Sequence, residues 1–382
     1  MDQPITTTAA IPDPPPAEQR FAVASQWRLM WWSFKRHRLA MLGGVIVLFL
    51  YLVAAIPGFF AINEPGRQNA RAVFHPPQTL HWIDTAEDGS WHFRPHVMAT
   101  RMARDPVTLA PSFRQDGTRK IYLAFFAQGY EHHLFGLIPS TIHLLAPENP
   151  REQVYLFGAD RLGRCVYSRI MVAAQTSLMI GLAGVFLSLV IGLLLGGISG
   201  YYGGRIDFAV QRVIEFVLSL PTIPIWLALG AALPQNWPPE RIYLCITIIL
   251  SLVGWAQLAR VVRGRFLSLR TEDFVTAARL DGVSEKRIIF RHMLPSFASH
   301  IIASVTLAIP AMILAETALS FLGLGLQPPV ISWGVLLREA QNIRSIATAP
   351  WLFAPGGAVV LAVLALNFLG DGLRDAADPY QK

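Results

Sequence analysis

Histidines are the first residues in this chain whose spacing could indicate chemistry. Seven of the ten lie between His75 and His143, which raises the question of a metal site. The chain has no His-Glu-x-x-His sequence, the spacing that places two imidazoles of one helix on a zinc ion. The only adjacent pair, His132 and His133, would point to opposite faces of a strand. We therefore expect ordinary surface histidines and no metal.

Phosphate chemistry is also not expected of this chain. A phosphate-binding loop needs a lysine directly after a glycine-rich turn. The four lysines, at positions 35, 120, 286 and 382, never follow a glycine. The sequence therefore predicts no ATP site, and any ATP-driven step must take place in another chain. Cys165 lies in a polar stretch and Cys245 in an apolar run, so a disulfide between them is not expected.

The composition indicates an integral membrane protein surrounded by lipid. Of 382 residues, 53% are hydrophobic and only 15% are charged, whereas soluble domains carry about 25% charged residues. The net charge of +7 could suggest nucleic acid. However, the basic residues cluster beside apolar runs, as the positive-inside rule predicts, so nucleic acid is not an expected partner.

Apolar runs predict six membrane-spanning helices, because about 18 or more such residues are enough to cross a bilayer. The predicted spans are Leu39–Ile62, Ser177–Tyr202, Phe208–Pro234 with interruptions at Pro221 and Pro224, Ile242–Ala259, Phe297–Leu326 and Ala349–Gly370. The expected organisation is an N-terminal tail (1–38), the first helix (39–62), a polar insertion (63–175) with some β-structure, a helical core (176–371) and a C-terminal tail (372–382).

Charge bias predicts which ends face the cytoplasm. Lys35, Arg36 and Arg38 abut the first span, and residues 260–295 hold eight Lys or Arg against four Asp or Glu. Basic residues near the ends of spans mark the cytoplasmic side. With six spans, both termini and the loop 260–295 are then cytoplasmic, and residues 63–175 are outside.

Few ionisable groups lie inside the predicted spans. Arg212 and Glu215 can pair at i and i+3 on one helix face, and His300 and Glu316 lie in the fifth span. A proton-coupled carrier or a channel usually has several such groups, so charge-relay transport is the weaker alternative. We expect Glu316 either to line a translocation path or to pair inside the bundle. Gly192, Gly196 and Gly200 follow the small-xxx-small pattern of closely packed membrane helices.

The loop 260–295 contains a candidate docking surface. Thr271 is the expected N-cap of a short helix on which Phe274, Ala277 and Ala278 share a face. Asp281 and Gly282 end that helix, because glycine readily takes the left-handed C′ conformation. Ser284 is expected to cap a second helix that runs to Leu294 and leads into the fifth span. An aromatic side chain beside two small residues favours docking into a groove of a partner.

The stretch "TAARLDGVSEKRIIFRHMLP" resembles the signature loop of binding-protein-dependent ABC-transporter permeases, a Glu-Ala-Ala sequence followed by Gly and a downstream Leu-Pro. The match is closest to the dipeptide/oligopeptide permease family. "FGADRLGRCVYSRI", "GYYGGRIDFAVQRVIEFVLSLP", "ETALSFLGLGLQPPVISWG" and "LNFLGDGLRDAADP" carry the similarity over roughly 157–379. The chain departs from the family pattern at Thr276, which stands where the family has Glu.

The resemblance implies an all-α membrane protein with the type I ABC importer permease fold and an extracytoplasmic insertion between helices 1 and 2. It implies a bacterial inner-membrane subunit with no enzymatic activity and no cofactor of its own. Such a subunit works with a second permease, ATP-binding subunits that bind the ATP, and an extracytoplasmic substrate-binding protein. The ATPase would dock on the loop carrying Phe274, Thr276, Ala277, Ala278 and Gly282. Di- or oligopeptides are the expected substrates, with nickel chelates or oligosaccharides as alternatives.

Overall fold

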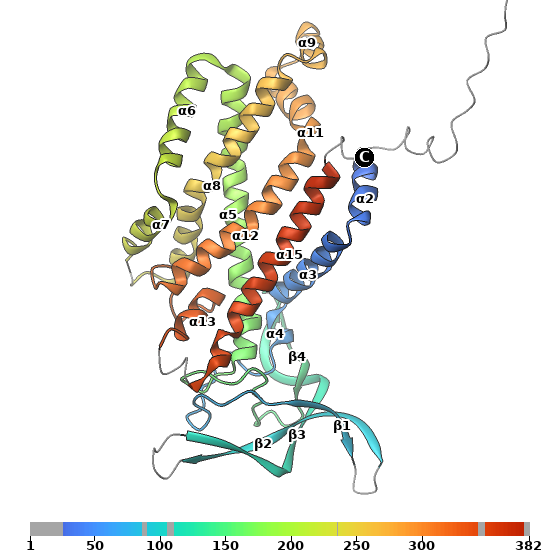
Figure 1. Ribbon diagram of the computed structural model, residues 1–382, viewed down its shortest axis with the longest axis vertical. Helices are drawn as coiled ribbons and strands as arrows, with labels where there is room; N and C mark the ends of the chain where they lie inside the picture. Colours follow the sequence, from blue (N-terminus) through green and yellow to red (C-terminus); the bar gives the residue numbers. More distant parts are fainter. Residues whose placement is uncertain (1–25, 86–89, 105–110, 235, 343–347, 378–382) are drawn as a thin grey trace, which may run out of the picture.

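The computed structural model describes residues 26–382, apart from 86–89, 105–110, 235, 343–347 and 378–382. A long bundle of helices has a small β-sheet at one of its ends (Figure 1). The Pro-rich part of the predicted N-terminal tail lies outside the described residues. Its basic end is not an open tail, because Gln26–Arg36 forms helix α2 and continues almost directly into the first span.

The bundle consists of apolar helices joined by short connections. Its elements are α3 (Arg38–Ala55), α4 (Pro57–Phe60), α5 (Val166–Tyr202), α6 (Gly204–Ser219), α7 (Thr222–Ala231), α8 (Pro239–Leu269), α9 (Asp273–Leu280), α10 (Glu285–Arg287), the π-helix η1 (Ile288–Met293), α11 (Leu294–Ser296), α12 (Ala298–Phe321), α13 (Trp333–Glu339), the 3-10 helix η2 (Pro350–Phe353) and α15 (Ala354–Ala377). Among the described residues, five helices are long and apolar enough to cross a membrane, and a bent pair raises the number to six.

The bent pair is formed by α6 and α7, whose axes differ by 83°. Leu220 ends α6 in an extended conformation and Pro221 precedes α7. A residue before proline is disfavoured in the helical region, so the break follows from the local sequence. The predicted interruption of the third span is confirmed, and it divides the span into two separate helices instead of only bending one. Arg212 and Glu215 form the predicted pair on α6, with Nη1 and Oε2 2.8 Å apart.

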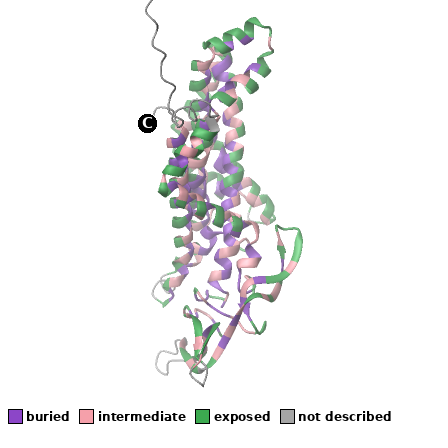
Figure 2. Cartoon of the chain, turned by 90° about the vertical axis from the view of Figure 1, so that its right-hand side faces the viewer, coloured by how far each residue is buried: buried purple, intermediate pink, exposed green. Residues whose placement is uncertain are grey.

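Glycines of α5 let α8 approach closely, as the small-xxx-small pattern predicted. A Cβ on Gly196 would lie 2.5 Å from the carbonyl oxygen of Ala259. A Cβ on Gly200 would lie 2.5 Å from the Cβ of Phe266. Both distances are too short for a real side chain, so the two helices pack here backbone against backbone. In Figure 2, residues coloured as buried lie along the centre of the bundle and exposed ones along its outside.

Helices extend beyond the apolar runs that predicted them. Helix α5 begins at Val166, inside the predicted 63–175 insertion, and α15 continues to Ala377, inside the predicted 372–382 tail. Helix α8 likewise continues through Leu269 into the predicted 260–295 loop. Hydropathy locates only the part of a helix that lies in hydrocarbon, whereas the backbone hydrogen bonds of a helix continue where its side chains become polar.

The predicted all-α class is incomplete, because the insertion folds as a four-stranded antiparallel sheet in the order β1-β2-β3-β4. The strands are β1 (Leu80–Thr85), β2 (Trp91–Arg104), β3 (Pro111–Leu134) and β4 (Ile138–Pro147). Val97, Ile121 and Leu123 form its core together with Ile62 and Val154. The β-structure expected in this segment is therefore observed.

Candidate functional site

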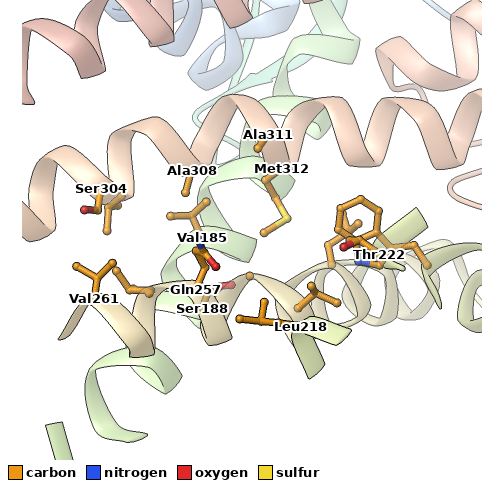
Figure 3. Close-up of a pocket in the computed structure, with 16 residues that line it drawn as sticks. Val185, Ser188, Leu218, Thr222, Gln257, Val261, Ser304, Ala308, Ala311 and Met312 are labelled. Carbon is orange, nitrogen blue, oxygen red and sulfur yellow. The ribbon is translucent and has the colours of Figure 1, made fainter. Parts of the chain in front are cut away.

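A pocket of about 400 Å³ opens between α5, α7, α8 and α12. Figure 3 shows side chains from these helices converging on it. Its wall is mainly aliphatic, with Ser188, Thr222, Gln257 and Ser304 as isolated polar groups. None of the described residues that line it is charged. Such a lining suits a neutral, partly apolar solute and does not suit a relay of protons between carboxylates.

Trp226, one of the residues that line the pocket, carries a buried hydrogen-bond donor that lacks an acceptor. Its side chain lines the pocket, and its indole Nε1 is buried without a partner among the described residues. A buried donor left unsatisfied costs roughly 1–3 kcal/mol. Sequence reasoning missed this group, because Trp226 lies in an apolar run where a packing role is the ordinary interpretation.

Glu316 lies in α12 with no exposed surface and is surrounded by hydroxyl groups. Its Oε1 accepts hydrogen bonds from Ser320 Oγ at 2.8 Å and from Ser332 Oγ at 2.9 Å. Its Oε2 accepts a longer bond from Ser177 Oγ at 3.4 Å. The predicted pairing inside the bundle is therefore observed, and Glu316 is not among the residues that line the pocket.

Each of these serines in turn accepts a backbone N–H. Ser320 Oγ accepts from Leu326 N at 3.0 Å, and Ser332 Oγ from Val335 N at 3.2 Å. Ser177 Oγ accepts from Trp333 N at 3.1 Å. One carboxylate thus organises the end of α12, the start of α13 and the facing side of α5. The three serines lie up to 139 residues from Glu316, so only its rarity inside a span marked it in the sequence.

A buried ion cluster joins the start of α5 to α13. Asp160 accepts hydrogen bonds from Arg169 and, at 2.7 Å, from Arg164 Nε. Glu339 Oε2 lies 3.0 Å from Arg169 Nη1, and its Oε1 lies 3.0 Å from Arg164 Nη2. Two positive and two negative charges therefore balance in a nearly closed site. The sequence analysis missed this cluster, because its partners are about 170 residues apart.

The loop predicted to dock a partner is compact, and Gly282 adopts the expected left-handed conformation, with φ of +70°. Val283 N donates to Ala278 O, which closes the turn after α9. Two details differ from the prediction. The N-cap is Glu272, because the Thr271 hydroxyl donates to the carbonyl of Ser268 instead. The helix expected from Ser284 to Leu294 is divided into α10, η1 and α11.

The expected common face of Phe274, Ala277 and Ala278 is divided in the structure. Ala278 is 8% exposed and packs, with Val275, in a cluster that includes Tyr201 and Phe266. Phe274 is 42% exposed, and Thr276 and Ala277 are also exposed. Ala278 therefore anchors α9 to the bundle, while the other three point outward. The sequence pattern correctly predicted an amphipathic helix. It did not show that other residues of this chain bury Ala278 at one edge of the predicted face.

Four of the seven clustered histidines contradict the prediction of surface histidines. His75, His96, His132 and His143 are buried in the sheet region. Both nitrogens of His143 contact backbone carbonyl oxygens, Nδ1 that of Gly58 at 2.7 Å and Nε2 that of Tyr130 at 3.0 Å. In the part of the chain that the structure describes, no three His, Cys, Asp or Glu side chains are arranged to hold a metal ion. These histidines fill the sheet core and bond its backbone.

Comparison with known families gives matches along most of the chain. Residues 175–381 match the model for "binding-protein-dependent transport system inner membrane component". Residues 25–77 match the model for the "N-terminal TM domain of oligopeptide transport permease C". The second match includes α2, α3 and α4, so the first apolar helix is a membrane span by similarity as well as by hydropathy.

Individual relatives include transport permeases from several bacteria. The oligopeptide transport system permease protein OppC of Bacillus subtilis (strain 168) is 34% identical over 68% of this chain and 81% of its own. The dipeptide transport system permease protein DppC of the same organism is 38% identical over 60% of this chain and 70% of its own. The dipeptide transport system permease protein DppC of Alkalihalophilus pseudofirmus is 28% identical over 97% of this chain and 95% of its own.

Among solved structures, an inward-facing form of the MetNI methionine ABC transporter is similar to this chain, with a TM-score of 0.44 and 17% identity. The match covers 55% of this chain and 96% of the other.

Proposed function

Because the chain belongs to the family of binding-protein-dependent transport system inner membrane components, we propose that it moves di- or oligopeptides across the inner membrane as one membrane subunit of an ATP-driven importer. The family is one of permease subunits, not of enzymes, and ATP is hydrolysed by a separate subunit. The names of the OppC and DppC relatives support peptides as the substrate class. The pocket is uncharged and mainly aliphatic, with isolated hydroxyl and amide groups, and such a lining suits a peptide backbone, which carries no net charge and has polar amide groups.

The proposed topology has six spans, with the bent pair of α6 and α7 counted as one. Helices α2 and α9 and the end of α15 lie at one end of the bundle, and the sheet lies at the other (Figure 1). The end with α2 and α9 carries the basic segment 35–38 and the basic loop 260–295. The positive-inside rule therefore supports cytoplasmic termini and an extracytoplasmic sheet. The proposed domains keep this order, with the insertion ending at Val166 where α5 begins.

The observation that carries the proposal is α9, a short helix beyond the cytoplasmic end of the long helices. Phe274, Thr276 and Ala277 face outward, where an ATP-binding subunit would dock. Val275 and Ala278 face inward, in one buried cluster with residues of α5, α8 and η1. A push on the outer face would therefore reach two of the helices that line the pocket through this cluster. The Gly282 corner holds α9 in place relative to α10 and η1.

The remaining partners follow from this arrangement. A second permease subunit would complete the path around the pocket, and an extracytoplasmic binding protein would deliver peptide at the end with the sheet. ATP would be bound by the partner subunits and no cofactor by this chain. Nucleic acid is not a proposed partner, because the basic residues on the proposed cytoplasmic side cluster in 35–38 and 260–295, beside the spans.

The test is uptake of a labelled peptide by the complete transporter in proteoliposomes. Ala277→Arg places a long cation on the outer face of α9, where the side chain is exposed. It should leave membrane insertion intact, remove co-purification of the ATP-binding subunit, and abolish uptake. Gly66→Arg is the matched control, since a Cβ added at this exposed glycine of the extracytoplasmic segment would meet no described atom within 4 Å. Normal uptake and ATPase binding by Ala277→Arg would contradict the assigned role of α9.

A further inference from the structure

The turn between β3 and β4 exposes large apolar side chains. Phe135 is 62% exposed, Leu137 81% and Ile138 58%. Turns on protein surfaces are normally built from Gly, Pro, Asn, Asp and Ser. Soluble surfaces rarely expose large contiguous apolar patches without a partner. The hairpin tip therefore has the character of a buried or membrane-facing surface, although no described part of this chain covers it.

Asp, Glu, Lys and Arg are also absent from the tip and from β4. Residues 134–147 contain no Asp, Glu, Lys or Arg. The only ionisable side chain in that range is His143, which is buried and bonded to backbone carbonyl groups. A protein docking site in water usually has a polar rim. A segment without charge over this length is instead suited to contact with lipid.

The hairpin is held at the outer end of the first membrane span. His143 Nδ1 lies 2.7 Å from the carbonyl oxygen of Gly58 in α4. The rings of Phe59 and Phe126 lie 6.2 Å apart, which links α4 to β3 as well. Helix α4 follows α3 after a single residue. Figure 1 shows β4 next to α4, between the helices and the rest of the sheet. The hairpin is therefore at the edge of the bilayer and not at the far side of the sheet.

The apolar surface is continuous from the span to the hairpin. Helix α3 exposes a stripe of apolar side chains, among them Leu48 and Phe49, as a lipid-facing helix does. Phe49 contacts Phe60, with ring centroids 5.8 Å apart, and Phe60 contacts Phe59 at 5.3 Å. Phe59 then contacts Phe126 on the hairpin. An unbroken series of rings connects the lipid-facing helix to the strand that carries the tip.

We propose that the β3–β4 hairpin is a membrane anchor whose tip, Phe135–Ile138, inserts into the interfacial layer of the outer leaflet beside α3. Aromatic and aliphatic side chains without charge are the groups that bind this layer. With α4 and the hairpin tip both held at the bilayer, the sheet has two separate attachments. Two attachments restrict tilting of the sheet relative to the bundle, so the sheet presents a constant face on the extracytoplasmic side.

Spin-label accessibility in the complete transporter, reconstituted in lipid nanodiscs, tests this anchor. Leu137→Cys is labelled in a background in which Cys165 and Cys245 are replaced by alanine, and Ile138→Cys serves as a second tip position. Gln115→Cys, on an exposed part of β3 outside the hairpin tip, is the matched control. At the tip, collisions with lipid-soluble oxygen should exceed those with a water-soluble nickel chelate. The order should reverse at position 115.

Two results would overturn the proposal. If the nickel chelate reaches both tip labels as readily as the control, the hairpin stands in water. If neither oxygen nor the chelate reaches them and the labels are immobilised, the tip contacts another protein chain, such as the second permease. Neither result bears on peptide uptake, so failure of the anchor is distinguishable from failure of the proposed transport function.

Discussion

Replacing Glu316 should loosen the junction between α12 and α13 in a graded way. The two short hydrogen bonds, from Ser320 and Ser332, both go to the same carboxylate oxygen. In Glu316→Gln the amide oxygen can occupy that position and keep both bonds. Hydrogen bonds to a charged group contribute about 1.5–3 kcal/mol each and neutral ones about 0.5–1.5. The expected loss of stability is therefore about 2 kcal/mol.

Glu316→Ala removes the acceptor altogether. The hydroxyls of Ser320 and Ser332 are then buried with no group to receive their protons, at about 1–3 kcal/mol each. The loss should be about 2–6 kcal/mol, with a further cost from the cavity that the missing side chain leaves. Thr306→Ala is the control on the same helix, because its hydroxyl bonds within α12, to Ile302 O.

The measurements are denaturation of the purified transporter and hydrogen exchange at the amides of Leu326 and Val335. These amides donate to the two serines, so their exchange should quicken more in Glu316→Ala than in Glu316→Gln. Equal stability and unchanged exchange in Glu316→Ala would refute the reasoning. An equal loss of stability in Glu316→Gln and Glu316→Ala would also refute it. That result would mean that the negative charge of Glu316 matters and the position of its acceptor oxygen does not.

Three further outcomes are expected. Gly196→Val should separate α5 from α8 and lower the yield of folded protein, because its Cβ would meet the Ala259 backbone. Gly264→Ala should be tolerated, because a Cβ there has no described atom within 4 Å. The yield of detergent-solubilised protein measures both effects. Arg169→Met should destabilise the bundle by about 3–5 kcal/mol, because two buried carboxylates, Asp160 and Glu339, are then left with one cation, Arg164, between them. The thermal midpoint of the purified transporter measures this loss. Burial lowers the pKa of His75, so the unfolded chain binds a proton at this side chain more readily than the folded chain does. The stability that neutral His75 contributes is therefore complete above about pH 6.5 and is lost as the pH falls below that value. Hydrogen exchange of the sheet amides at about pH 5 and about pH 7 should show this difference, and His75→Gln should reduce it.

The positions of the apolar spans were predictable because each depends on a local property of the sequence. A run such as 177–202 can be stable only in hydrocarbon or a core, whatever its neighbours are. Pro221 breaks a helix and Gly282 permits a left-handed corner through their own backbone preferences. The close-packed glycines of α5 were also visible, since their four-residue spacing puts them on one face.

The polar interior of the protein was not predictable in the same way. Glu316 was notable as a carboxylate in a span, but its three serines come from two helices and a loop. The cluster of Asp160 and Arg169 depends on Glu339, which approaches only when α13 folds back against α5. Hydrogen bonds and ion pairs of this kind act over about 3 Å, and sequence distance says nothing about which groups meet at that range.

Local properties of the amino-acid chain were enough to specify a membrane protein with apolar helices, a basic end and a left-handed corner at Gly282, because hydropathy, charge and backbone preference act within a few residues. That Ala278 faces inward while Ala277 faces outward, and that four histidines are buried, emerged only from the folded arrangement. The same arrangement brings the apolar turn after β3 to the outer end of α3. Whether a side chain is covered depends on which distant segment packs against it, and that is a property of the folded chain.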